Sequence, residues 1–307
     1  MPTLIDVEPL AQALRDLTLG DPLAHGALTV VPLLGPGAPD PGWLTLAEAG
    51  DAVTIEEVSE DGAVPTLHVT SAADRPVLLL DGEELIGAKQ NRVLNTTVLV
   101  AAHSRLTIPV SCVEQGRWAY KSMRFAASDT SLYASVRARK AAKVTESLRT
   151  RGQHTSDQGE IWHRLSMKAA AHDVESPTEA MSDFYARHAQ QMDAARAALA
   201  PRPGQVGALV FLGERWIGLD LLPSPGLFER AWPRLCASYA AEAVGRNERV
   251  PAPDPRALLQ GLALAPVDEA PAVGLGREHR LGGKAMAGAA LVAGDTVAHL
   301  MAFPTEA

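Results

Sequence analysis

Short apolar runs separated by Gly, Pro and Asp fill the first part of the chain. Many of them alternate apolar and polar positions or carry β-branched side chains, which is typical of half-buried β-strands. This pattern predicts strands over residues 26–34, 51–59, 66–72, 75–80, 83–88, 96–102 and 105–113. A helix is expected before them, over residues 7–20, where apolar residues recur at helical spacing until Gly20.

The spacing of apolar residues changes from residue 128 onward. Helical composition and spacing predict helices over residues 131–152, 156–174, 177–200 and 225–246, and Pro233 marks a kink or a late start in the last of them. Strand patterns return over residues 206–222 and 288–303, and Gly294-Asp295 is expected to join two strands in the second of these. Residues 149–159 are predicted to be a mobile surface loop.

Strands, then helices, then strands again favour an α+β fold over strict βαβ alternation. We expect β-rich layers built from both ends of the chain, residues 22–127 and 205–304, with a central helical segment, residues 128–200, packed on them. The Pro-rich linker 249–256 is too short to separate independent domains. Residues 1–307 are therefore expected to form a single compact domain.

Composition and charge narrow the classes of function. The net charge of −8 and the isoelectric point of 5.6 argue against nucleic acid and anionic membranes as partners. They do not argue against a local basic pocket. No apolar run reaches the length of about 18 residues that a membrane span needs, and the N-terminus lacks the pattern of a secretory signal. Cys112 and Cys236 are far apart in sequence and are interpreted as reduced thiols of a cytoplasmic protein.

Two segments of the chain echo one another. Val77–Gly87 aligns without gaps on Ala208–Gly218, with five identical positions that include Gly82 and Gly213. Each copy is predicted to form a β-hairpin that turns at its glycine. After the first copy the chain continues with a polar cluster that the second copy lacks, which favours a task for this cluster beyond folding.

The polar cluster consists of Lys89, Gln90, Asn91, Arg92 and Asn95. A second group follows at the end of a predicted strand and contains Cys112, Glu114, Arg117 and Trp118. Guanidinium, amide and aromatic groups together suit a polar, planar or phosphorylated ligand. The alternative is a buried hydrogen-bond network that only holds strands together. We expect the two groups to lie in one neighbourhood, with Arg92 for an anionic part of the ligand, Glu114 as the candidate general base and Cys112 as a candidate nucleophile.

The segments Asp81–Arg92 and Ile108–Trp118 resemble the core of a bacterial domain family of poorly characterised function. The family is named for its association with ADP-ribosylglycohydrolases and with rhodanese- and phosphatase-superfamily proteins. The resemblance covers most of the chain after Pro22. It implies a link to ADP-ribose or nucleotide metabolism and identifies no reaction or cofactor. Relatives often carry a carboxylate where this chain has Asn91, so the resemblance places no general base there.

Common catalytic motifs are absent from the sequence. It contains no phosphate loop of the usual Gly-rich types and no G-x-S-x-G elbow. Glu160 and His163 form one E-x-x-H, but no second such motif accompanies it, and no metal site is predicted.

Two classes of function stay open. The first is an enzyme or binding protein for a nucleotide-like or phosphorylated small molecule. The second is a non-catalytic interaction module, including a homo-oligomer, in which the same polar residues are structural.

Overall fold

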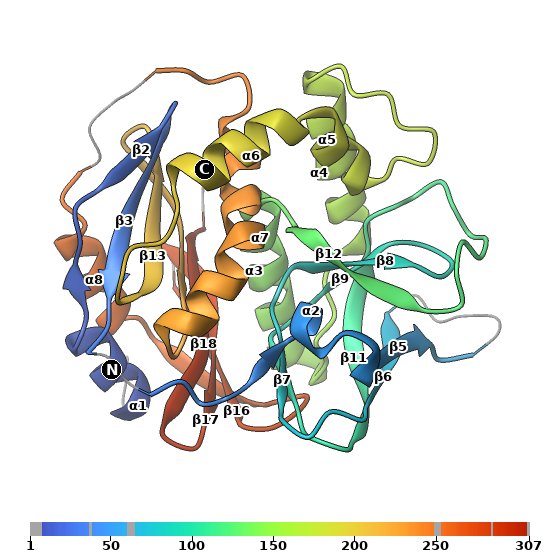
Figure 1. Cartoon of the computed structure of the whole chain (residues 1–307), viewed down its shortest axis with the longest axis horizontal. Helices are drawn as coiled ribbons and strands as arrows, with labels where there is room; N and C mark the ends of the chain where they lie inside the picture. Colours follow the sequence, from blue (N-terminus) through green and yellow to red (C-terminus); the bar gives the residue numbers. More distant parts are fainter. Residues whose placement is uncertain (1–7, 37–38, 60–64, 249–252, 284, 306–307) are drawn as a thin grey trace.

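A closed β-barrel and a large antiparallel sheet lie on either side of two long helices (Figure 1). The computed structural model describes residues 8–36, 39–59, 65–248, 253–283 and 285–305. Strands and helices both contribute substantially, so the α+β class predicted from the sequence is confirmed.

The large sheet has nine strands and is built from both ends of the chain. Its order is β1-β3-β13-β14-β18-β17-β16-β15, and β2 pairs with β3. The strands are β1 (Thr18–Leu19), β2 (Leu23–His25), β3 (Leu28–Leu34), β13 (Gln205–Leu212), β14 (Arg215–Leu221), β15 (Val267–Pro271), β16 (Arg277–Gly282), β17 (Met286–Ala293) and β18 (Thr296–Pro304). The antiparallel pairing of β3 with β13 joins the two ends of the chain.

Six strands close the barrel in the order β11-β6-β5-β12-β8-β9. They are β5 (Val53–Glu57), β6 (Thr66–Ser71), β8 (Glu83–Gly87), β9 (Arg92–Leu94), β11 (Arg105–Cys112) and β12 (Phe125–Ser131). Alternate side chains along each strand fill the interior, and Ile55, Val69 and Ile108 are among them. A small three-stranded sheet packs beside the barrel, with β4 (Leu44–Thr45), β7 (Val77–Leu79) and β10 (Val98–Val100).

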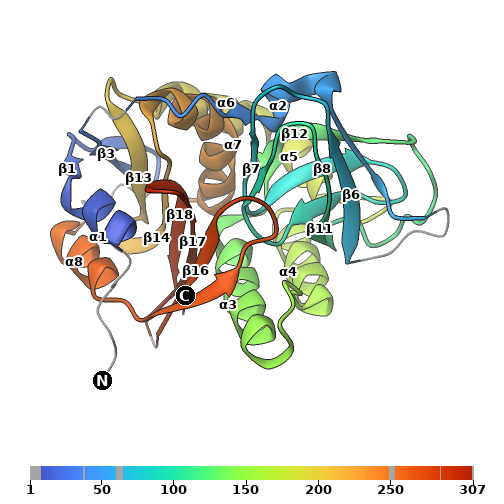
Figure 2. The same ribbon diagram turned by 90° about the horizontal axis from the view of Figure 1, so that it is seen from below.

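Eight helices complete the part of the chain that the structure describes. They are α1 (Glu8–Arg15), α2 (Leu46–Ala49), α3 (Ala134–Arg151), α4 (Gln158–Ala171), α5 (Met181–Arg187), α6 (Ala189–Ala198), α7 (Pro225–Ala243) and α8 (Arg256–Ala263). Helix α3 contacts β16, β17 and β18, while α1 and α8 lie together at the far side of the large sheet (Figure 2). None of the described helices is both long and apolar enough to cross a membrane.

Local expectations met mixed outcomes. The hairpin over Ala208–Gly218 is confirmed, with Gly213 at φ +60° between β13 and β14. The prediction of a hairpin over Val77–Gly87 is wrong, because β7 pairs with β10 and β4 while β8 pairs with β9 and β12. Gly82 turns the chain at φ +78°, but its N–H donates to the carbonyl of Leu94 instead of closing a hairpin.

Pro233 was predicted to mark either a kink or a late start of its helix, and the structure differs from the second of these. The Ser224 side chain caps it by accepting from the N–H of Leu227, and Pro225 occupies the first turn. The helix then continues through Pro233 to Ala243. A late start at Pro233 is therefore wrong.

Buried charges connect the barrel side with the large sheet through α3. Arg137 donates to both oxygens of Asp220 at 2.6 and 3.0 Å, and all of these side chains are fully buried. Lys140, one turn further along, is hydrogen-bonded to Asp81. His299 on β18 also contacts Asp220, at 2.9 Å. These five residues are called the ionic bridge below.

Candidate functional site at the barrel mouth

Glu57, Arg92 and Cys112 lie at the same end of the barrel. Each continues the interior-facing row of its strand, because Ile55, Leu94 and Val110 two positions away pack inside. Arg92 is also the direct partner of Cys112 in the pairing of β9 with β11. These three side chains, together with Lys89, Gln90 and Trp118, are called the barrel mouth.

Arg92 is fully buried yet has unused hydrogen-bonding capacity. Its Nη1 donates to Gln90 Oε1 at 2.9 Å and contacts the Cys112 thiol. Its Nη2 lies 3.6 Å from Glu57 Oε1, which is within ion-pair range but beyond a hydrogen bond. Among the residues that the structure describes, Arg92 Nε and Nη2 and both Glu57 carboxylate oxygens have no hydrogen-bond partner. Buried polar groups of this kind are rare in native proteins and call for water, an ion or a ligand.

Aromatic side chains lie next to the two cations of the barrel mouth, Arg92 and Lys89. The guanidinium of Arg92 is 5.5 Å from the centre of the Trp118 ring, and the Lys89 ammonium is 5.4 Å from the same ring. Lys89 is also 5.1 Å from the ring of Tyr120. Trp118 and Tyr120 keep 47% and 45% of their surface exposed, which leaves aromatic area available for stacking.

The Cys112 thiol is poorly suited to nucleophilic attack. Burial raises its pKa to about 11, although the nearby Arg92 partly opposes this effect. The thiol is therefore protonated at neutral pH, and only the thiolate is a strong nucleophile. The Gln158 amide at the start of α4 bonds both the N–H and the C=O of Cys112 and fixes the end of β11.

Asn91, Glu114 and Arg117 form a separate network beside the mouth. Arg117 donates to both oxygens of Glu114 at 2.8 and 2.6 Å and to the carbonyl of Ala88 at 2.6 Å. Glu114 also accepts from the Asn91 N–H and from Thr178. Burial alone would raise the pKa of Glu114, but these hydrogen bonds and the positive charge of Arg117 outweigh it and lower the pKa. A carboxylate held ionised in this way is a weak base.

Glu84 is a better proton acceptor than Glu114, although it was not among the site residues predicted from the sequence. Burial raises its pKa to about 7, while hydrogen bonds from Thr130 and Ser128 limit the rise. Asn91 bridges the two carboxylates, since its backbone N–H donates to Glu114 and its side-chain Nδ2 lies 3.5 Å from Glu84 Oε1. Two nearby carboxylates with pKa values driven apart are a common arrangement for acid–base chemistry.

Asn95 is bonded to different partners from those of the mouth residues. Its Nδ2 donates to the carbonyl of His154 at 2.9 Å, and its Oδ1 accepts from Ser111 at 2.7 Å. His154 lies in the segment predicted to be a mobile loop, and its ring contacts Glu278 at 2.8 Å. The structure thus brings seven of the eight predicted residues into two adjoining networks and ties Asn95 to the loop after α3.

Glu57 and Glu84 were missed because each lies in a segment with a sufficient local explanation. Glu57 lies near the end of the strand predicted over residues 51–59, and Glu84 lies near the start of the strand predicted over residues 83–88. A signal was nevertheless present, since period-two alternation places Glu57 on the face of Ile55.

Metal binding finds no support in the described part of the chain. No group of three or more His, Cys, Asp and Glu side chains there could hold a metal ion. Glu160 of the E-x-x-H motif instead pairs with Arg164 at 3.1 Å.

Comparison with known proteins places this arrangement in a family. The chain has no significant match among curated proteins or among solved structures. The family described as the ARG and Rhodanese-Phosphatase-superfamily-associated Protein domain matches residues 16–303. This range includes the barrel, the large sheet and every residue of the candidate site. The chain therefore belongs to the ARG and Rhodanese-Phosphatase-superfamily-associated Protein domain family, as its resemblance in sequence indicated.

Proposed function

We propose that the barrel mouth binds a nucleotide-like or phosphorylated small molecule. The observation that carries this proposal is the fully buried Arg92, whose Nε and Nη2 lack hydrogen-bond partners among the described residues. A guanidinium presents donors in a fork that suits phosphate or carboxylate oxygens. The ends of β-barrels are also frequent sites for small ligands.

The neighbouring groups fit the other parts of such a ligand. Trp118 offers an exposed aromatic plane for a base or another flat ring, and Lys89 adds a second positive charge beside it. Glu57 supplies acceptors that have no hydrogen-bond partner among the described residues, and such acceptors suit the N–H groups of a heterocycle. The link between the family name and ADP-ribosylglycohydrolases makes ADP-ribose one of the ligands to test.

If the bound molecule is also transformed, Glu84 is the best candidate for the group that exchanges a proton. Its pKa of about 7 lies near physiological pH, where a general acid or base is most effective. Asn91, Glu114 and Arg117 then hold the loop that connects β8 and β9 in place.

A non-catalytic interaction module is the second candidate function. The network of Asn91, Glu114 and Arg117 favours it, because Glu114 and Arg117 satisfy one another and several backbone groups. Under this alternative, bound water satisfies the remaining hydrogen-bond donors of Arg92, and no small ligand is needed.

Thermal unfolding in the presence of ligands distinguishes the two. The wild type should be stabilised by a nucleoside phosphate, ADP-ribose or a sugar phosphate, by about 2.7 kcal/mol at a concentration 100 times the dissociation constant. Trp118→Ala and Lys89→Ala should lose this stabilisation. Met123→Ala is the matched control, since Met123 lies in the same loop and is 75% exposed. If no phosphorylated compound stabilises the wild type, or if all three variants respond alike, the binding proposal is wrong.

A further inference from the structure

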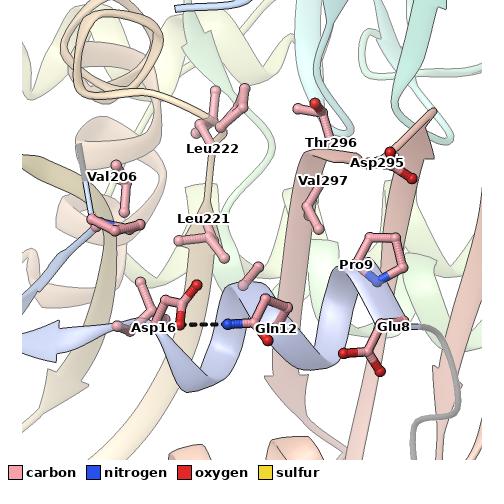
Figure 3. A pocket seen from close by; sticks show the side chains of 15 residues that line it. Glu8, Pro9, Gln12, Asp16, Val206, Leu221, Leu222, Asp295, Thr296 and Val297 are labelled. Atoms are coloured by element: carbon pink, nitrogen blue, oxygen red, sulfur yellow. Dashed lines mark hydrogen bonds between the residues drawn. The ribbon is translucent and has the colours of Figure 1, made fainter. Parts of the chain in front are cut away.

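A cavity of about 430 Å³ lies far from the barrel mouth, between α1 and one end of the large sheet. Figure 3 shows α1 along one side, with Leu221, Leu222 and Val206 facing it from the sheet. The turn between β17 and β18 forms another wall, where Val297 lies close to Pro9. No residue of the barrel mouth lines this cavity.

The walls of the cavity are mainly apolar. Val206, Leu221, Leu222 and Val297 are all buried, so their side chains form a fixed lining. Ala13 and Leu17 contribute further apolar surface from the α1 side. The volume lies within the range of about 300–1,000 Å³ that is usual for small-molecule sites. An apolar body of compact size would therefore replace water against this lining favourably.

The charged groups around the cavity all have the same sign. Glu8, Asp16 and Asp295 line it, whereas no basic residue is found among the described residues of its lining. Glu8 is already paired with Arg15 at 2.7 Å. Among the described residues, the Asp16 carboxylate accepts only from the neutral Gln12 amide, at 2.6 Å, and Asp295 forms no ion pair. Figure 3 places Asp16 directly after α1, beside Gln12, and Asp295 at the β17–β18 turn, on separate parts of the rim.

We propose that this cavity is a second ligand site, which takes a small organic cation with a compact apolar body. The apolar lining would accept the body, and Asp16 or Asp295 would lie near the ammonium group at the rim. Anionic ligands are disfavoured because carboxylates lie at the rim and, in the described part of the chain, no basic side chain lines the cavity. Its preference for charge is thus opposite to that of the barrel mouth, where Lys89 and Arg92 lie, and it does not depend on the function proposed for the mouth.

Three compounds with one carbon skeleton test the proposal directly. Cyclohexylmethylamine, cyclohexylmethanol and cyclohexanecarboxylate differ mainly in their charge and are titrated into the full-length protein at millimolar concentration. Methyl NMR of Leu, Ile and Val residues reports both affinity and location. The amine should shift the signals of Leu221, Leu222, Val206 and Val297 and bind most tightly. Its advantage over the alcohol should be about two- to five-fold for each carboxylate that it engages, since exposed ion pairs are weak.

Variants separate the contribution of charge from that of the cavity. Asp16→Asn combined with Asp295→Asn should remove the preference for the amine over the alcohol, whereas the exposed Asp51→Asn should leave it unchanged. Ala13→Phe should fill the cavity and weaken all binding there, because Ala13 lines it and is only half-buried. The proposal is overturned if the wild type binds none of the three compounds, if the carboxylate binds as well as the amine, or if the shifted methyl groups lie elsewhere. Unchanged binding to Ala13→Phe would overturn it as well.

Discussion

Replacing Glu84 by glutamine should stabilise the protein above neutral pH and have much less effect under mildly acidic conditions. In the folded protein the Glu84 carboxyl has a pKa of about 7, against an ordinary value of 4.5, because burial disfavours its charge. At low pH the group is protonated in both the folded and the unfolded state. As pH rises, the unfolded state ionises first, and the folded state loses stability relative to it.

The sign and size of the effect follow from the two pKa values. The stability associated with protonated Glu84 is fully present below pH 4.5 and is lost as pH rises through about 7. At 1.36 kcal/mol for each pKa unit, the loss above pH 7 amounts to about 3 kcal/mol. Glutamine is neutral at every pH and avoids this loss. Its hydrogen bonds with Thr130 and Ser128 differ from those of the acid, which adds a contribution that does not depend on pH.

Urea denaturation at a series of pH values measures the effect. The difference in unfolding free energy between Glu84→Gln and the wild type should grow by about 3 kcal/mol between about pH 4.5 and pH 8.5. Glu214→Gln is the matched control, since Glu214 occupies an exposed turn, and its difference should stay flat. A difference that does not change with pH, or one that turns against Glu84→Gln at high pH, would show that Glu84 is ionised in the folded protein at neutral pH.

Three further outcomes are expected. Asp220→Asn should lower the unfolding free energy in chemical denaturation by about 3–5 kcal/mol, because it removes the carboxylate that accepts two hydrogen bonds from the buried Arg137 and leaves only Asp81, at 3.8 Å; a cost similar to that of the exposed Asp51→Asn would contradict this. Cys112 and Cys236, whose pKa values burial raises to about 11 and about 12, should react with a thiol reagent only as the protein unfolds, so rapid labelling of the native protein would be inconsistent with the structure. Random duplex DNA or RNA should not bind appreciably at physiological salt because the net charge is −8, and salt-sensitive binding in a mobility-shift assay would refute this.

Sequence patterns located most strands of the fold where apolar and polar residues alternate. Residues 26–34 and 105–113, for example, contain β3 and β11. The same patterns failed for β12, whose sequence from Phe125 to Ser131 is rich in small polar residues. Its buried Ser128 is hydrogen-bonded to Glu84, a residue 44 positions earlier, and no local pattern reveals such a partner.

Pairing between strands was less accessible than the strands themselves. The echo between Val77–Gly87 and Ala208–Gly218 is close in sequence, yet only the second copy is a hairpin. In the first copy β7 pairs with β4 and β10, whereas β8 pairs with β9 and β12 of the barrel. Strand β16 carries the charged residues Arg280 and Glu278, whose remaining partners lie far away in the sequence, on α3 and at His154.

The sequence indicated most of the polar residues of the candidate site, but not their division into the barrel mouth and the network of Asn91, Glu114 and Arg117. The polar sequence after Gly87 was the feature that singled out Arg92 and its neighbours as a candidate site. Successive side chains of an extended segment point to opposite faces, and this separates the cluster into two networks. Arg92 points into the barrel, while Asn91 is hydrogen-bonded to groups outside it. Closure of the barrel brings Glu57 to Arg92 across 35 residues of sequence, and the sequence alone contains no indication of that closure.

The ionic bridge has a consequence for how the protein unfolds. Asp81 precedes β8 of the barrel, Asp220 belongs to the large sheet, and both depend on cations of α3. Separation of the barrel from the sheet would expose α3 and leave at least one of these charges without its partner in a partly apolar environment, at a cost of several kcal/mol. Partly unfolded states that keep only one of the two β structures are therefore scarcely populated. Local opening would then be confined to peripheral elements such as α1, and the barrel, α3 and the sheet would be lost in a single cooperative transition.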